Sequence, residues 1–243
     1  MAKKRKADVT KGVVVATIVA ILGLTIAVGY FLGGDKLVVA LFDKEEDRAY
    51  YFITTAGIDD VTIAHQNADL IRLRGGAGYV DMRADNSIVL AVYPDKNSAE
   101  NVLVKLGDNS LVVREIPMKA VSVSLKDKGL RSAVNEALTY FDLTFDTLYN
   151  LSNSLADNEV TVDDVKTQIG VLSSKIDDIK SVFYEKTKNS SLDEITEIKL
   201  ALVTALAIID GVEIGNTAKT LSSLRRQTVQ LVYCHQALAL TLS

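Results

Sequence analysis

The longest uninterrupted apolar stretch of this chain lies near its start. Residues 12–34 contain no charged side chain, and the segment from Val13 to Leu32 is aliphatic, aromatic or small apart from two threonines. About 20 helical residues with a rise of about 1.5 Å each cover a hydrocarbon core of about 30 Å. The pattern therefore predicts one transmembrane helix over residues 12–34.

The charges beside this stretch predict its orientation. Residues 1–11 form a basic tail, whereas the linker at residues 35–48 is mainly acidic. Because Lys and Arg stay on the cytoplasmic side, we expect a single-pass protein of the cell membrane with its N-terminus cytoplasmic and its later domains extracytoplasmic. A removable signal peptide is the alternative, but its apolar region has only about 7–15 residues. The cations of the tail are Lys3, Lys4, Arg5, Lys6 and Lys11.

In residues 49–118, the spacing of apolar residues alternates between the two-residue period of strands and the 3.6-residue period of helices. A turn at Asp85-Asn86 joins two alternating runs and predicts a hairpin. The order of elements is β-α-β-β-α-β, which is the split βαβ arrangement of ferredoxin-like folds. It predicts one four-stranded antiparallel sheet with two helices on one face and the other face open to a ligand. The expected strands are 50–55, 78–83, 87–93 and 110–116, and the expected helices are 61–74 and 99–106.

Residues 125–243 have the helical period throughout, and apolar residues recur at steps of three and four. Short turn-like joints predict an antiparallel four-helix bundle. The third helix has an apolar centre, LALVTALAII, which is too short for a second membrane span and is expected to be buried. The fold class is thus α+β: one N-terminal transmembrane helix, a ferredoxin-like domain and a helical bundle. The clearest stripes are Val134, Leu138, Phe141, Phe145, Leu148, Ser152, Leu155; Val165, Ile169, Leu172, Ile176, Ile179, Phe183; and Leu221, Leu224, Thr228, Leu231, His235, Leu238, Leu242.

Composition narrows the possible chemistry. The formal net charge is −4 although the tail is basic, so the acidic remainder argues against nucleic acid as a partner. His65 and His235 are the two histidines and Cys234 is the one cysteine, so we expect no metal site, no cofactor and no enzyme. We expect a buried, inert Cys234 thiol rather than an intermolecular disulfide. Arg225-Arg226 is expected on the charged outer face of the last helix.

Two similar halves make up residues 49–117. The first has Tyr51-Phe52-Ile53-Thr54, then Asn67-Ala68-Asp69-Leu70 and Gly76, and the second has Val89-Leu90-Ala91-Val92-Tyr93-Pro94, then Ser98-Ala99-Glu100 and Leu106. In this, the segment resembles the SPOR (sporulation-related repeat) family of membrane-anchored proteins.

The resemblance implies a bacterial scaffold that binds peptidoglycan glycan strands during sporulation or cell division. Aromatic rings would stack on sugars, and Arg and hydroxyl groups would hydrogen-bond to their oxygens. The helical bundle would bind a protein partner. The alternative is an extracytoplasmic protein–protein adaptor that binds no glycan. The tentative glycan-binding residues are Thr54, Tyr79, Arg83, Tyr93 and Arg114.

Overall fold

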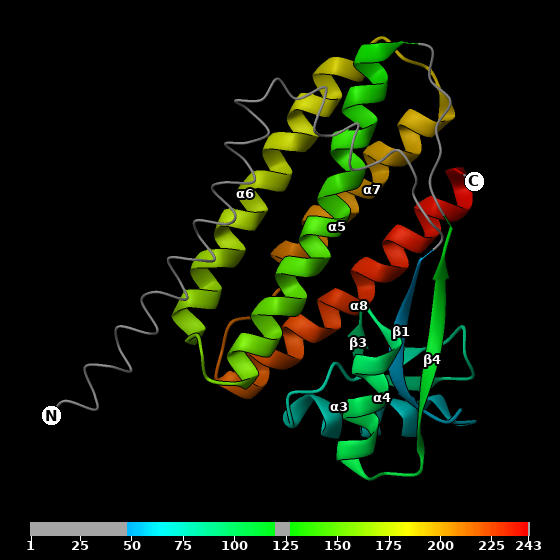
Figure 1. The fold of residues 1–243 in the computed structure, drawn as a ribbon, viewed down its shortest axis with the longest axis vertical. Coiled ribbons are helices and arrows are strands. Elements are labelled where there is room, and N and C mark those ends of the chain that lie inside the picture. The colour runs from blue at the N-terminus through cyan, green and yellow to red at the C-terminus, as the bar shows by residue number, and fades with distance from the viewer. Residues whose placement is uncertain (1–47, 120–126, 243) are drawn as a thin grey trace, which may run out of the picture.

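The computed structural model describes residues 48–119 and 127–242, which form a small α+β unit beside a long helical bundle (Figure 1). The bundle occupies the upper part of the view and the sheet with its two short helices the lower part. The elements are β1 (Arg48–Thr55), α3 (Val61–Leu73), β2 (Tyr79–Asp81), β3 (Ser87–Tyr93), α4 (Lys96–Leu106), β4 (Leu111–Met118), α5 (Lys128–Ala156), α6 (Val162–Thr187), α7 (Asp193–Asp210) and α8 (Thr217–Leu242).

The sheet is antiparallel, with the strand order β2-β3-β1-β4. β1 lies in the middle and pairs Phe52 with Val92 of β3 and with Arg114 of β4. The turn between β2 and β3 places Asp85 and Asn86 at φ +48° and +54°, the left-handed conformation that short hairpin turns require. The β-α-β-β-α-β order therefore agrees with the pattern of residues 49–118.

Aspartates fix the starts of α3 and α4. The Asp60 carboxylate accepts hydrogen bonds from the first free backbone N–H groups of α3, and Asp95 accepts one from Ser98 in α4. Small residues let both helices approach the sheet closely: Ala68 of α3 and Ala99 of α4 are fully buried. Both helices contact the sheet, and α4 forms a second, small hydrophobic core with one face of the sheet.

The bundle consists of α5, α6, α7 and α8, each contacting the next, with α8 returning to α5. A capping box at Thr161 and Asp164 starts α6. Every residue of the three stripes expected from the sequence is buried in the structure. Burial of these stripes against one another holds the four helices together, because removal of apolar area from water is the main favourable contribution to folding.

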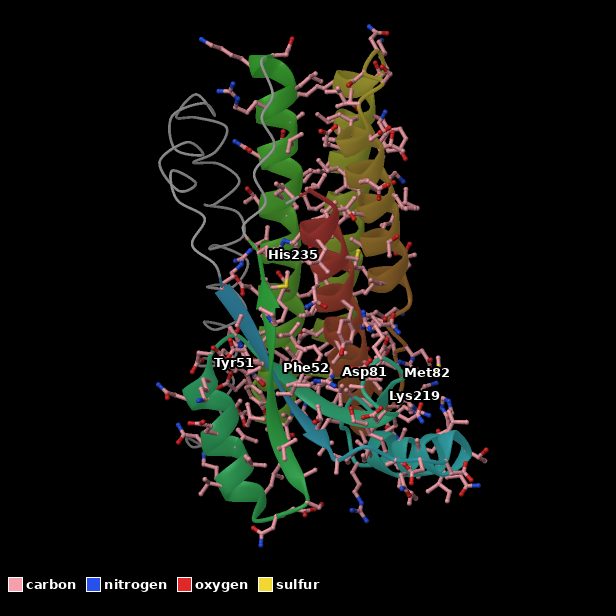
Figure 2. All side chains as sticks on the ribbon, turned by 90° about the vertical axis from the view of Figure 1, so that its right-hand side faces the viewer. Tyr51, Phe52, Asp81, Met82, Lys219 and His235 are labelled. Atoms are coloured by element: carbon pink, nitrogen blue, oxygen red, sulfur yellow. The ribbon has the colours of Figure 1, made fainter. Side chains whose placement is uncertain are left out.

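Contrary to the prediction, the sheet face expected to be open to a ligand is covered by the bundle. α8 and α5 cross it, so that Phe52 meets the Tyr233 ring edge-on at 5.4 Å and Tyr50 lies 4.4 Å from Phe145. Figure 2 shows Phe52 and Asp81 where the sheet meets the bundle, with His235 further along α8. The prediction failed because α8 is buried on two sides, and only its stripe toward the bundle is apolar enough to be recognised in the sequence.

The predicted fold class also needs correction in its membrane-spanning helix. Among residues 48–119 and 127–242 the structure shows six helices and a four-stranded antiparallel sheet, and none of those helices is long and apolar enough to span a bilayer. The predicted tail (1–11), span (12–34) and most of the linker (35–48) lie outside the described residues. The corrected fold class is α+β, with the sheet unit and the bundle sharing one core.

Candidate binding site

Three of the five residues predicted to bind glycan lie at the junction between the sheet and the bundle. Thr54 is buried, with 1% of its surface exposed. Tyr79, Arg83 and Arg114 surround the ring of Tyr233 on α8. The fifth, Tyr93, packs against α4 and meets Tyr149 of α5 at 6.1 Å. None of the five forms part of an open platform on the sheet.

A buried carboxylate, Asp81, organises this junction. The Tyr233 hydroxyl and Nη2 of Arg114 each donate to Asp81 Oδ2 over 2.5 Å, and that guanidinium also donates to the Tyr233 oxygen over 2.9 Å. Arg83 stacks its guanidinium 3.4 Å above the centre of the Tyr233 ring. Charge-assisted bonds of this kind are the stronger class of protein hydrogen bonds.

Electrostatics keep Asp81 ionised. Burial by itself raises the pKa of this carboxyl, but the bonds from Tyr233 and Arg114, with the charge of Arg114, outweigh burial and hold its pKa below the usual value. Burial also raises the pKa of the Tyr233 hydroxyl, which therefore stays a proton donor. A carboxylate with a lowered pKa is a poor general base. The role of the cluster is therefore structural: its hydrogen bonds join the sheet to α8.

Sequence reasoning missed both central members of this cluster. Asp81 is not among the candidate residues that the sequence predicts, and Tyr233 lies outside the predicted stripe of α8. A tyrosine in a helix is common in bundles, so nothing local marks Tyr233 as a partner of a strand residue 152 positions earlier.

A larger groove lies elsewhere, where β1, β4 and the start of α4 meet. Its volume is about 590 Å³, within the range of ligand pockets. Half-buried Tyr51 contributes the aromatic surface and lies next to Phe52 in β1 (Figure 2), so their side chains leave opposite faces of the sheet. The groove is lined by Arg48, Ala49, Tyr51, Pro94, Asp95, Lys96, Glu115, Pro117, Met118 and Lys119.

Charges of both signs surround this groove. Arg48 forms an ion pair with Asp142 of α5, and Lys96 lies 3.5 Å from Glu100 within α4. Asp95 caps α4, and its hydrogen bonds with Ser98 lower the pKa of its carboxyl. Exposed Glu115 and Lys119 add one acid and one base from the end of β4. The groove therefore suits a ligand with mixed polar and apolar character rather than a purely anionic one.

Among the strands of residues 48–119, none lies beside the outer edge of β4. β4 is the last strand of the sheet and pairs only with β1 among the described residues, and Figure 1 shows it at the outer margin of the molecule. Near its end, the Pro117 carbonyl accepts a bond of 3.3 Å from Gln236 of α8. The edge before Pro117 offers backbone N–H and C=O groups to another strand.

The described residues contain no arrangement suited to metal binding. No group of three or more His, Cys, Asp or Glu side chains in residues 48–119 and 127–242 is placed to hold an ion. His235 is buried and stacks on Phe141 at 5.5 Å, whereas His65 lies exposed on α3. Burial raises the pKa of the Cys234 thiol to about 11, which agrees with an inert thiol.

Comparison with known proteins adds no relative: no family model, no curated protein and no solved structure matches this chain. The resemblance to the SPOR family therefore stays a prediction from residues 49–117.

Proposed function

We infer that this protein is a non-enzymatic adaptor that binds an extended segment of a partner protein along β4. The observation that carries the inference is the edge of β4 that pairs with no other described strand, beside a groove of about 590 Å³. Strand addition to a sheet edge is a common mode of peptide recognition, in which main-chain bonds give affinity and pockets for alternate side chains give specificity.

The open edge has the length and the composition that this mode needs. From Leu111 to Glu115 the strand is regular and pairs residue by residue with β1. Val112 is 48% exposed and presents an apolar side chain beside the edge. Pro117 has no N–H to donate, and its carbonyl is bonded to Gln236, so an added strand would end there.

The groove gives the added strand a place for side chains. Tyr51 and the two prolines supply apolar contact, while Lys96, Asp95 and Glu115 offer polar partners of both signs. A partner segment with alternating apolar and charged residues fits this lining. Tyr51, Glu115 and Pro117 of the groove belong to the sheet face opposite to Phe52, whereas Arg48 and Met118 reach the groove from the face that the bundle covers.

Glycan binding, the first expectation from the sequence, receives less support than the adaptor. Thr54 and Tyr93 are buried, Tyr79 and Arg114 are half-buried, and exposed Arg83 stacks on Tyr233. In addition, α8 occupies the sheet face on which sugars would stack. Membrane anchoring through residues 12–34 and an extracytoplasmic location stay predictions.

Site-specific photo-crosslinking in the producing cell tests the adaptor. A photoreactive residue replaces Val112 in the full-length protein, and Val171 of α6, which is also 48% exposed, serves as the matched control position. We expect adducts with one sequence segment of one partner from position 112 and none from position 171. The substitution Val112→Lys should abolish adducts from a photoreactive residue at position 115, because lysine on a strand edge opposes pairing, whereas Val171→Lys should not.

Other outcomes contradict the adaptor. Equal adducts from both positions would show nonspecific contact, and adducts only with residues 35–47 of the same chain would show that this edge serves the protein itself. Retention of the full-length protein on purified peptidoglycan, increased by amidase treatment and unaffected by Val112→Lys, would restore glycan binding in its place.

A further inference from the structure

A second, smaller crevice lies between the sheet unit and the bundle, away from β4. It is formed where β3 meets α5 and α8, and its polar lining comes from Tyr93, Tyr149, Ser152, Asn153, Arg225 and Thr228. Arg225 was expected on the outer face of α8. Instead it faces α3, where Nη1 donates to the Gly75 carbonyl over 3.0 Å.

Arg225 has no counter-charge in the described part of the chain. Its neighbour Arg226 pairs with Glu213 at 3.0 Å, but no ion pair joins Arg225 to any described carboxylate. Asp157 acts on the guanidinium only from beyond ion-pair distance, and burial lowers the pKa of Arg225. Arginine stays charged under these conditions, and a shielded positive charge without a partner is costly.

Some of the hydroxyl groups around the Arg225 guanidinium already donate hydrogen bonds within their own helices. Ser152 and Thr228 donate to carbonyls of their own helices over 2.8 Å. The Asn153 side chain lies beside the Tyr149 hydroxyl and opposes the rise in the pKa of Tyr149 that burial causes. The Tyr93 hydroxyl forms no hydrogen bond with a described residue. The phenols of Tyr93 and Tyr149 and the guanidinium of Arg225 therefore line one crevice, and no described carboxylate is among its lining side chains.

The size of the crevice limits what it accommodates. It contains about 240 Å³ of empty space counting its open mouth, but only about 10 Å³ of this is available to the centre of a water molecule. That volume holds one water-sized species. A halide ion or the tip of a carboxylate fits, whereas a sugar ring or a nucleotide does not.

We propose that the crevice between β3, α5 and α8 is a binding site for one small anion, a halide or a carboxylate, held by Arg225 and by the hydroxyls of Tyr93 and Tyr149. The bound anion supplies the missing counter-charge. Because its ligands come from the sheet unit and from two helices of the bundle, its occupancy strengthens the junction between them. The proposal does not depend on the adaptor function.

Thermal unfolding of the full-length protein tests the site. Sodium methanesulfonate, whose three-oxygen head is larger than a halide or a carboxylate, is replaced stepwise by sodium chloride, bromide or acetate at constant sodium and pH 7. We expect the melting temperature to rise with the logarithm of the anion concentration for all three small anions, as for a ligand of the native state. Arg225→Gln should abolish the rise, and Arg226→Gln, on the same helix, should leave it unchanged.

Two further measurements distinguish the loss of an anion site from a general disturbance of the fold by Arg225→Gln. Tyr149→Phe removes one donor with little change of shape, and we expect it to reduce the rise at least twofold. Bromide in crystals should give an anomalous peak within hydrogen-bonding distance of the Arg225 guanidinium. Equal rises in wild type, Arg225→Gln and Tyr149→Phe would overturn the proposal. So would a bromide peak without any thermal response, which would indicate an adventitious ion only.

Discussion

The hydroxyl of Tyr233 in α8 donates a hydrogen bond of 2.5 Å to the carboxylate of Asp81 in β2 and thereby joins the helical bundle to the sheet. Asp81 is 3% exposed, and its other bonds come from Arg114 and Arg83. Each partner of a buried charge matters for stability, because the loss of one leaves part of the free-energy cost of removing that charge from water uncompensated. The pair therefore supplies the most direct test of how the two parts of the protein are held together.

Replacing Tyr233 with Phe should lower the free energy of unfolding by about 1–3 kcal/mol, because the Asp81 carboxylate loses a donor while it stays buried. Urea unfolding followed by circular dichroism measures the change as a lower midpoint at an unchanged slope. Tyr184→Phe is the matched control, since Tyr184 is exposed and its ring still faces Lys199. Equal effects of the two substitutions would show that the Asp81 bond contributes nothing.

His235 should make stability depend on pH. Burial, followed by the charge of Arg48, lowers the pKa of His235 from 6.5 to about 4. A group with a depressed pKa contributes stability above its unfolded pKa and loses it as the pH falls toward the folded pKa. Between pH 6.5 and 4 the free energy of unfolding should therefore fall by about 3 kcal/mol on account of this residue.

The substitution His235→Leu isolates that contribution from the carboxyl groups nearby, such as Asp142 at 3.8 Å. In urea titrations at pH 7, 6 and 5, the variant should show a shallower dependence on pH than the wild type. His65→Gln, at the other histidine, should keep the wild-type dependence because His65 is exposed. If the free energy of unfolding of His235→Leu depended on pH as steeply as that of the wild type, His235 would not be the source of the pH dependence.

Removing the Phe52 ring should destabilise the sheet and the bundle together. Phe52 is fully buried and belongs to the core that both parts share. Phe52→Ala should cost about 3–5 kcal/mol, and the loss of helix and of tyrosine environment should still coincide in one transition. Leu73→Ala, at a position 74% exposed, should have little effect. Two separate transitions in the wild type would mean that the junction is weaker than its contacts indicate.

Three glycines should respond differently to alanine. Gly78 has φ +52°, and an added Cβ would lie 2.4 Å from the Ala68 carbonyl, so Gly78→Ala should destabilise by more than about 2 kcal/mol. Gly107 has φ +62° with nothing within 4 Å of such an atom, which leaves only a backbone cost of about 1 kcal/mol. Gly170 lies within α6 with open space around it, so Gly170→Ala should stabilise by about 0.5–1 kcal/mol. Differential scanning calorimetry of the three variants checks this order, and a destabilised Gly170→Ala would contradict it.

Much of the local structure was predictable, because local periodicity and turn chemistry depend only on neighbours in the chain. β3 spans the predicted residues 87–93, and α3 ends one residue before its predicted end. The start of α4 was placed too late, since its cap is Asp95. The start of α7 has no side-chain cap at Leu192. Such boundaries depend on which of several polar residues meets the free N–H groups.

The candidate sites were beyond the reach of the sequence. Thr54, Tyr79 and Arg114 were chosen correctly as residues of strands, but the assumption that their face is open was wrong because α8 covers it. Tyr51 was noted only as part of a motif, and its groove exists because β1, β4 and α4 converge there. Arg225 could not be separated from Arg226 by position alone.

The sequence by itself determined the order and type of the elements within residues 48–119 and 127–242 and the inward stripes of the bundle, because hydrophobic periodicity is a local property that each helix or strand expresses on its own. Only the tertiary structure decided that the second side of α8 closes the sheet, that Tyr233 reaches Asp81 across 152 residues, and that Arg225 reaches Gly75 across 150. The physical reason is that one hydrogen bond or ion pair between distant segments leaves no periodic signal, and its partners are selected by packing of the whole chain.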